Sequence, residues 1–145
     1  MSAFRSGRRR GNNIIEFSLL MPWYVFLFAG AFDYGFYAYS LIATQDAARV
    51  AALYCSTSSS TKADASTACT YALGQLQGMA NVTACSLSGS PPLSVTASSV
   101  AAADGSGNTD TSVTVTYTTP QLIPVPGLFP GKLTLARTVQ MRVRS

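Results

Sequence analysis

The sequence predicts an α+β protein with a long N-terminal helix (about residues 14–55), a second short helix (62–79) and a small antiparallel sheet. Three observations lead to this fold class. An apolar run with almost no charge continues into an alanine-rich segment. A second stretch carries an apolar stripe at helical spacing. The C-terminal part alternates apolar and hydroxyl side chains, which is typical of strands with one buried face and one wet face.

Charged residues are few and unevenly placed. The formal net charge is +4, and 11% of the residues are charged. Arg5 and Arg8–Arg10 precede residue 11, and the rest of the chain carries six basic and six acidic residues. Because no basic face extends over the folded part, we expect no nucleic acid partner. A basic cap before an apolar segment instead predicts an N-terminus held on the cytoplasmic side of a membrane.

The long helix is predicted to be a membrane span in its first part. Residues 17–32 carry no charge, and a span of residues 14–41 is long enough when Glu16 and Asp33 lie near its two interfaces. Residues 40–54 are rich in alanine, and their apolar side chains recur at three- and four-residue spacing, which indicates one buried face. Such a helix is roughly 60 Å long, twice the thickness of a membrane, so its second half is expected to project outward and pack.

A Ser/Thr run at residues 56–61 breaks this pattern and supplies N-cap candidates for the second helix. Short alternating stretches beyond it predict strands at residues 81–87, 93–100, 111–119 and 133–144. The loop at 102–110 is predicted to be a hairpin connection. The loop at 119–132 is rich in proline and apolar residues, so we expect it to cover a core, meet a neighbour or touch lipid headgroups.

Several charged residues and short motifs could suggest a functional site but also fit ordinary structural roles. Arg137 falls on the apolar parity of its strand, which predicts a sheet edge or a buried carboxylate partner, and the edge is favoured. The Asp104–Asp110 loop lacks the residue order of a calcium loop and is interpreted as a plain turn. The triplet Asn81–Thr83 matches a glycosylation motif that is common by chance. Asp33 and Asp46 lie about 20 Å apart on one helix, so they cannot serve one reacting bond.

The chain has three cysteines and no histidine. The lack of histidine excludes a Ser-His-Asp triad, a Cys-His pair and a His-ligated metal. Cys55, Cys69 and Cys85 all follow the apolar segment, so one disulfide and one spare thiol are expected if that region is exported. An antiparallel helix–strand pair would bring Cys69 and Cys85 together, which makes Cys69–Cys85 the first choice and Cys55–Cys69 the second.

The order of motifs from Arg8 to about Tyr54 resembles the TadE-like minor pseudopilins of bacterial tight-adherence (Flp-type) pili. The resemblance rests on a basic stretch ending in glycine, a Glu-Phe pair, a proline in the apolar run, an acidic-aromatic-Gly triplet and an Ala-Arg pair. The corresponding residues are Arg8, Arg9, Arg10 and Gly11, then Glu16-Phe17, Pro22, Asp33-Tyr34-Gly35 and Ala48-Arg49. The residues around the C-terminal proline loop are also similar to the family, so a pilin-like fold is expected.

The resemblance implies a leader at residues 1–11, the helix at 12–55 and a periplasmic α+β domain at 56–145. A membrane prepilin peptidase would cut between Gly11 and Asn12, which leaves Glu16 as the fifth residue. In pilins this glutamate is thought to engage the free amine of an adjacent subunit, and a carboxylate in low dielectric needs such a cation. Asp33 is interpreted as an interface residue or an assembly contact. Arg8–Arg10 would orient the chain.

Two functions are therefore expected from different classes. The first is a minor pseudopilin in the bacterial inner membrane, whose partners are other pilins or pseudopilins and the assembly platform, and which either is incorporated in a pilus or stays in that platform. The second is an uncleaved, membrane-anchored periplasmic domain that recognises an envelope component through its Thr-rich sheet face or its proline loop. Neither requires a cofactor, a metal or a small-molecule substrate, and no enzyme activity is expected because no acid–base constellation exists.

Overall fold

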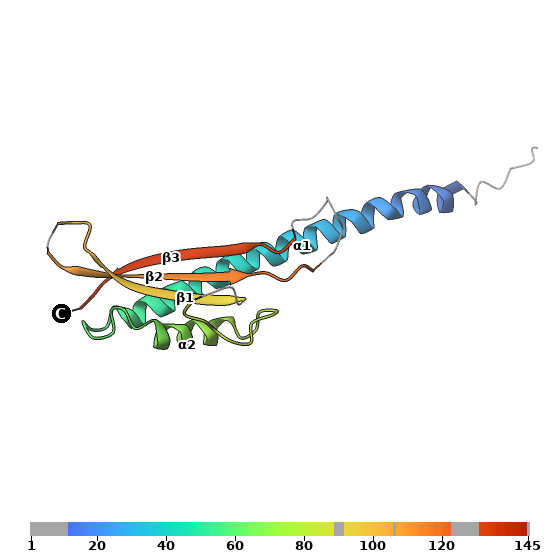
Figure 1. The fold of residues 1–145 in the computed structure, drawn as a ribbon. Helices are drawn as coiled ribbons and strands as arrows, with labels where there is room; N and C mark the ends of the chain where they lie inside the picture. The colour runs from blue at the N-terminus through green and yellow to red at the C-terminus, as the bar shows by residue number, and fades with distance from the viewer. Residues whose placement is uncertain (1–11, 89–91, 106, 123–130, 145) are drawn as a thin grey trace, which may run out of the picture.

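The computed structural model describes residues 12–88, 92–105, 107–122 and 131–144. It confirms the predicted α+β class, with a sheet of strand order β1-β2-β3 in which both pairs are antiparallel (Figure 1). The elements are α1 (Asn12–Cys55), α2 (Ala65–Leu76), β1 (Leu93–Ala101), β2 (Thr109–Thr118) and β3 (Thr134–Arg142). Both helices lie on the same side of the sheet: α1 packs against β2 and β3, while α2 packs against α1 and β1.

Helix α1 divides into an exposed half and a packed half. The large apolar side chains from Ile14 to Phe28 are between 43% and 77% exposed, and this half projects beyond the sheet (Figure 1). From Ser40 onward one helical face is buried, and it consists mainly of small residues that let the sheet approach closely. The buried residues of this face are Ser40, Thr44, Ala47, Ala48, Ala51, Ala52 and Cys55. The predicted packing of the second half is therefore confirmed.

The two buried hydroxyls on this face are satisfied within the helix. Ser40 Oγ donates to the Phe36 carbonyl at 2.8 Å, and Thr44 Oγ1 donates to the Ser40 carbonyl at 2.7 Å. Because each hydroxyl bonds one turn back, it is buried without the cost of an unpaired donor. The helix ends at Cys55, where the Ser56 amide still donates to Ala52 O at 2.9 Å.

Helix α2 begins later and ends earlier than the predicted 62–79. Asp64 is its N-cap, and the Asp64 carboxylate accepts from the Thr67 amide at 3.1 Å and from the Ser66 hydroxyl at 2.7 Å. These donors favour the charged form, so they hold the pKa of Asp64 below its usual range. The cap marks the start of the helix, because Asp64 itself has non-helical backbone angles (φ −77°, ψ 83°) and its side chain satisfies an amide of the first turn.

The sheet alternates as predicted, with one face toward the helices. Its inner rows are Leu93, Val95 and Ala97 on β1, Thr111, Val113, Val115 and Tyr117 on β2, and Leu135, Arg137, Val139 and Met141 on β3. The outer rows carry mostly Thr and Ser, and Thr114 Oγ1 lies 2.7 Å from Thr138 Oγ1 across the strands. Arg137 is half-buried on the edge strand β3, which agrees with the edge interpretation.

The predicted strand at 81–87 is wrong. Asn81 turns the chain with a φ of 75°, and only Ser86 pairs with the sheet, through a parallel bridge to Ser94 on β1. The Ser86 amide donates to Leu93 O at 3.1 Å, and the Val95 amide donates to Ser86 O at 3.0 Å. The segment makes only these isolated backbone hydrogen bonds to the sheet and no continuous strand pairing, so its alternating pattern does not produce a strand.

Candidate functional site

Most of the exposed large hydrophobic side chains of the described residues lie on the first half of α1. Within the described ranges, α1 is the one helix long and apolar enough to cross a membrane, and it fits a single-pass anchor. It has 44 residues and is therefore about 66 Å long, enough for a bilayer core of roughly 30 Å and a further packed half. Ser18 Oγ donates to Ile14 O at 2.8 Å, which satisfies this hydroxyl inside the apolar surface.

Glu16 lies near the start of this exposed half. Its side chain is exposed in the single chain, and the large apolar residues Ile14, Ile15 and Phe17 around it are 59% to 70% exposed. A carboxylate in such an apolar surface is stabilised by a cation once the surface is covered. The predicted cleavage residue Gly11 and the orienting Arg8–Arg10 lie outside the described residues. Asn12 is the first residue of the helix.

Asp33 lies where the exposed half of α1 meets the domain. Together with Phe36 and Tyr37 it lines one small cavity with Thr119, Pro120, Gly131 and Leu133. The volume is about 10 Å³, which holds at most one water, so the arrangement is a packing contact rather than a ligand site. The structure thus brings Asp33 to the two ends of the proline-rich loop, although most of that loop, residues 123–130, lies outside the described residues.

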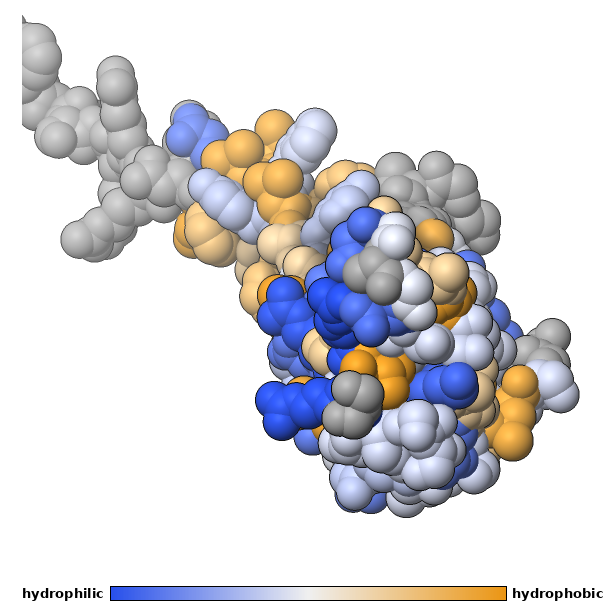
Figure 2. Space-filling view, turned by 90° about the vertical axis from the view of Figure 1, so that its left-hand side faces the viewer, coloured by the Kyte–Doolittle hydropathy of each residue, from blue (hydrophilic) through white to orange (hydrophobic). Residues whose placement is uncertain are grey.

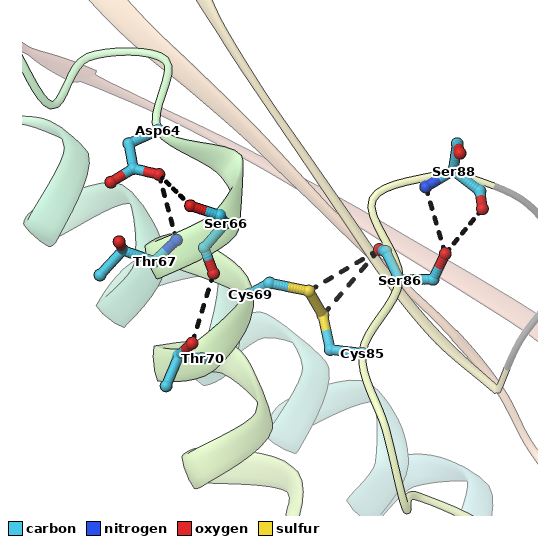
Figure 3. Close-up of a disulfide and its surroundings, with 8 residues drawn as sticks. All are labelled: Asp64, Ser66, Thr67, Cys69, Thr70, Cys85, Ser86 and Ser88. Atoms are coloured by element: carbon cyan, nitrogen blue, oxygen red, sulfur yellow. Dashed lines mark hydrogen bonds between the residues drawn. A yellow bond between two sulfur atoms is a disulfide. The ribbon is translucent and has the colours of Figure 1, made fainter.

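A disulfide joins Cys69 on α2 to Cys85 in the segment that follows (Figure 3). Their Cα atoms are 5.8 Å apart, and this is the pairing that the sequence ranks first. Ser86, next to Cys85, is the residue that bridges to β1, so the disulfide and the bridge together connect α2 to the sheet edge. Cys55 is free and fully buried, and burial raises the pKa of its thiol, which makes it a packing residue.

The far end of the domain carries residues that sequence reasoning did not single out. Lys62, in the turn before α2, and Arg144, after β3, line one polar cavity with Asn108 of the β1–β2 connection. Nothing local in the sequence marks these positions, because they come from three distant segments. In the described part of the chain, no group of three potential ligand side chains could hold a metal ion.

The segment of the chain that matches a known protein family lies within α1. Residues 14–53 match the family model described as TadE-like protein, which confirms the resemblance expected from the sequence. The match covers most of α1 and none of the sheet. No curated protein and no solved structure matches the chain.

Proposed function

We propose that this protein, TadE-like over residues 14–53, is a minor pseudopilin that takes part in assembling a tight-adherence (Flp-type) pilus. The TadE-like family implies a role in such pilus systems, and that role is structural rather than enzymatic. One observation carries the proposal. The matched segment coincides with a helix that is exposed and apolar in its first half and part of the domain core in its second half.

The proposed mechanism follows from this division of α1. The exposed half anchors the chain in the inner membrane, with the N-terminus in the cytoplasm and the domain in the periplasm. A prepilin peptidase removes residues 1–11 by cutting after Gly11, and Asn12 becomes the amino terminus. When the helix joins neighbouring subunits, the Glu16 carboxylate engages the new amine of an adjacent chain. Asp33 and the ends of the proline loop form a further assembly contact with other pilins or the assembly platform.

The test is the intact mass of the mature protein purified from cells with and without the prepilin peptidase. In the presence of the peptidase we expect a chain that starts at Asn12, and in its absence a chain that keeps the leader. A chain that keeps residues 1–11 in both strains contradicts the processing step. That outcome would favour an uncleaved, membrane-anchored domain that binds an envelope component.

A further inference from the structure

A polar cavity lies at the end of the domain farthest from the exposed half of α1. Its volume is about 180 Å³, more than ten times the roughly 10–15 Å³ that one water needs. The lining residues are Ser59, Lys62, Gly107, Asn108, Thr109, Val143 and Arg144. Figure 2 faces this end of the molecule, where hydrophilic side chains gather, while the apolar surface of α1 lies behind.

The residues that line this cavity include two bases and no carboxylate. Among the described residues, Arg142 forms the ion pair of this region, with Asp104 at 3.2 Å. Neither Lys62 nor Arg144 has a carboxylate within ion-pair distance in the described part of the chain. The cavity therefore presents two cations, an ammonium and a guanidinium. An arginine fork binds carboxylate or phosphate oxygens in pairs, and a lysine adds a point charge.

The backbone under both cations is held by the fold. The Lys62 carbonyl accepts from Thr111 Oγ1 at 2.7 Å, and Thr111 is fully buried on the central strand. The Arg144 amide donates to Ser56 O at 2.9 Å, directly after the end of α1. Both anchors belong to the core, so the positions from which the two side chains extend are set before any ligand arrives.

We propose that this cavity binds the phosphate group of a soluble molecule or polymer end. A tetrahedral phosphate offers more acceptor oxygens than a carboxylate, and the lining residues Ser59, Lys62 and Arg144 all carry donor groups. The site itself is independent of the pseudopilin proposal. The choice of a soluble source rests on the pseudopilin proposal, in which Asp33 lies near the membrane surface. Cys55, next to the Ser56 carbonyl that holds Arg144, lies about 33 Å along α1 from Asp33. Headgroups of the anchoring membrane therefore do not reach the cavity.

The experiment uses the full chain in nanodiscs of neutral phosphatidylcholine and inorganic phosphate as the probe. Binding is measured by calorimetry or by the shift of the thermal midpoint, at constant ionic strength set with sodium chloride. We expect saturable binding that Lys62→Gln and Arg144→Gln each weaken by about fivefold and that the double variant abolishes. Lys132→Gln is the matched control, because Lys132 is an exposed base at the opposite end of the sheet, and it should leave the affinity unchanged.

Three outcomes would overturn the proposal. The first is phosphate binding that does not saturate or that sodium chloride reproduces. The second is an equal effect of Lys132→Gln, which would show a response to net charge. The third comes from nanodiscs that contain anionic phosphatidylglycerol: a loss of phosphate binding only there would identify a lipid headgroup as the occupant. A start of the mature chain at Met1 would contradict the pseudopilin proposal and leave the phosphate result unaffected.

Discussion

Single side chains tie the layers of this domain together. Tyr117, on the central strand, is fully buried, and its hydroxyl donates to Ala80 O at 2.7 Å. Burial raises the pKa of Tyr117, because the phenolate is poorly solvated there. The alternation of the sequence places this ring on the inner face. The hydrogen-bond partner of the Tyr117 hydroxyl, Ala80 O in the turn after α2, could not be predicted from the sequence.

Glu16 provides the residue-scale prediction for assembly. Glu16→Gln keeps the size of the side chain and removes its charge, so the proposed pair with the amine of an adjacent subunit is lost. Breaking a charge pair in a low-dielectric interface costs roughly 3–5 kcal/mol, and we therefore expect pilus assembly to fall at least about tenfold. Electron microscopy and the amount of sheared pili measure this effect.

The matched control for Glu16 is Asp46→Asn on the same helix. Asp46 is exposed in the packed half of α1, so its change should leave assembly close to wild type. Equal defects in the two variants would mean that any charge change in α1 disturbs assembly, and the specific role of Glu16 would then be rejected. Unchanged piliation in Glu16→Gln would reject it as well.

At the scale of elements, the disulfide replaces the ladder that the sequence predicted for residues 81–87. Cys69 and Cys85 close a loop with a sequence separation of 16, and a loop of this size stabilises the fold by roughly 3 kcal/mol in the chain-entropy model. Without it, the segment is held to the sheet by the single bridge at Ser86. The disulfide thus adds a covalent link, through Cys85 and the bridge at Ser86, to the direct packing of α2 against β1.

Replacing both cysteines, Cys69→Ser with Cys85→Ser, should lower the free energy of unfolding by about 3 kcal/mol. The midpoint of urea unfolding measures this change, and a reducing agent should shift the wild type by a similar amount. Cys55→Ala is the control, since Cys55 is outside the disulfide. Because Cys55→Ala keeps the disulfide, it should respond to the reducing agent as the wild type does. A control that does not respond, or no difference between the double variant and the wild type, would contradict the prediction.

The elements differ in how far their sequences determined them. The bounds of α1 agree closely with the prediction, because alanine content and helical spacing both act within the segment. The strands β1, β2 and β3 follow from their alternation. Residues 81–87 also alternate, but a strand needs a partner, and only one of these residues finds one. Strand formation therefore depends on contacts that a short pattern does not contain.

For the molecule as a whole, α1 contributes both an exposed apolar half and part of the domain core. The core includes Ala47, Ala48, Ala51, Ala52 and Cys55 of α1 together with inner-face residues of the sheet. The sequence-based division at residue 56 would separate these groups. We propose instead that the independently folding unit begins near Phe36, the first α1 residue that packs against the core.

A fragment of residues 36–145 should therefore be soluble and unfold cooperatively, whereas a fragment of residues 56–145 should not fold. Loss of α1 exposes Val113, Val115 and Tyr117, and each buried side chain of this kind contributes roughly 1.5–3 kcal/mol. That sum is comparable with the whole stability of a typical domain, about 5–15 kcal/mol. Circular dichroism during heating distinguishes the two fragments, and a cooperative transition in 56–145 would refute the shared role of α1.

The sequence by itself determined the two helices, the strands β1, β2 and β3, and the apolar first half of α1, because charge, helical spacing and alternation are properties of neighbouring residues. Only the tertiary structure decided which distant groups meet: Asp33 with the ends of the proline loop, Ser86 with β1, and Lys62 with Arg144. These tertiary contacts depend on how the alanine face of α1 packs against the inner face of the sheet. The physical reason is that the packing geometry depends on the shapes of both surfaces together, and the sequence of either segment alone does not specify it.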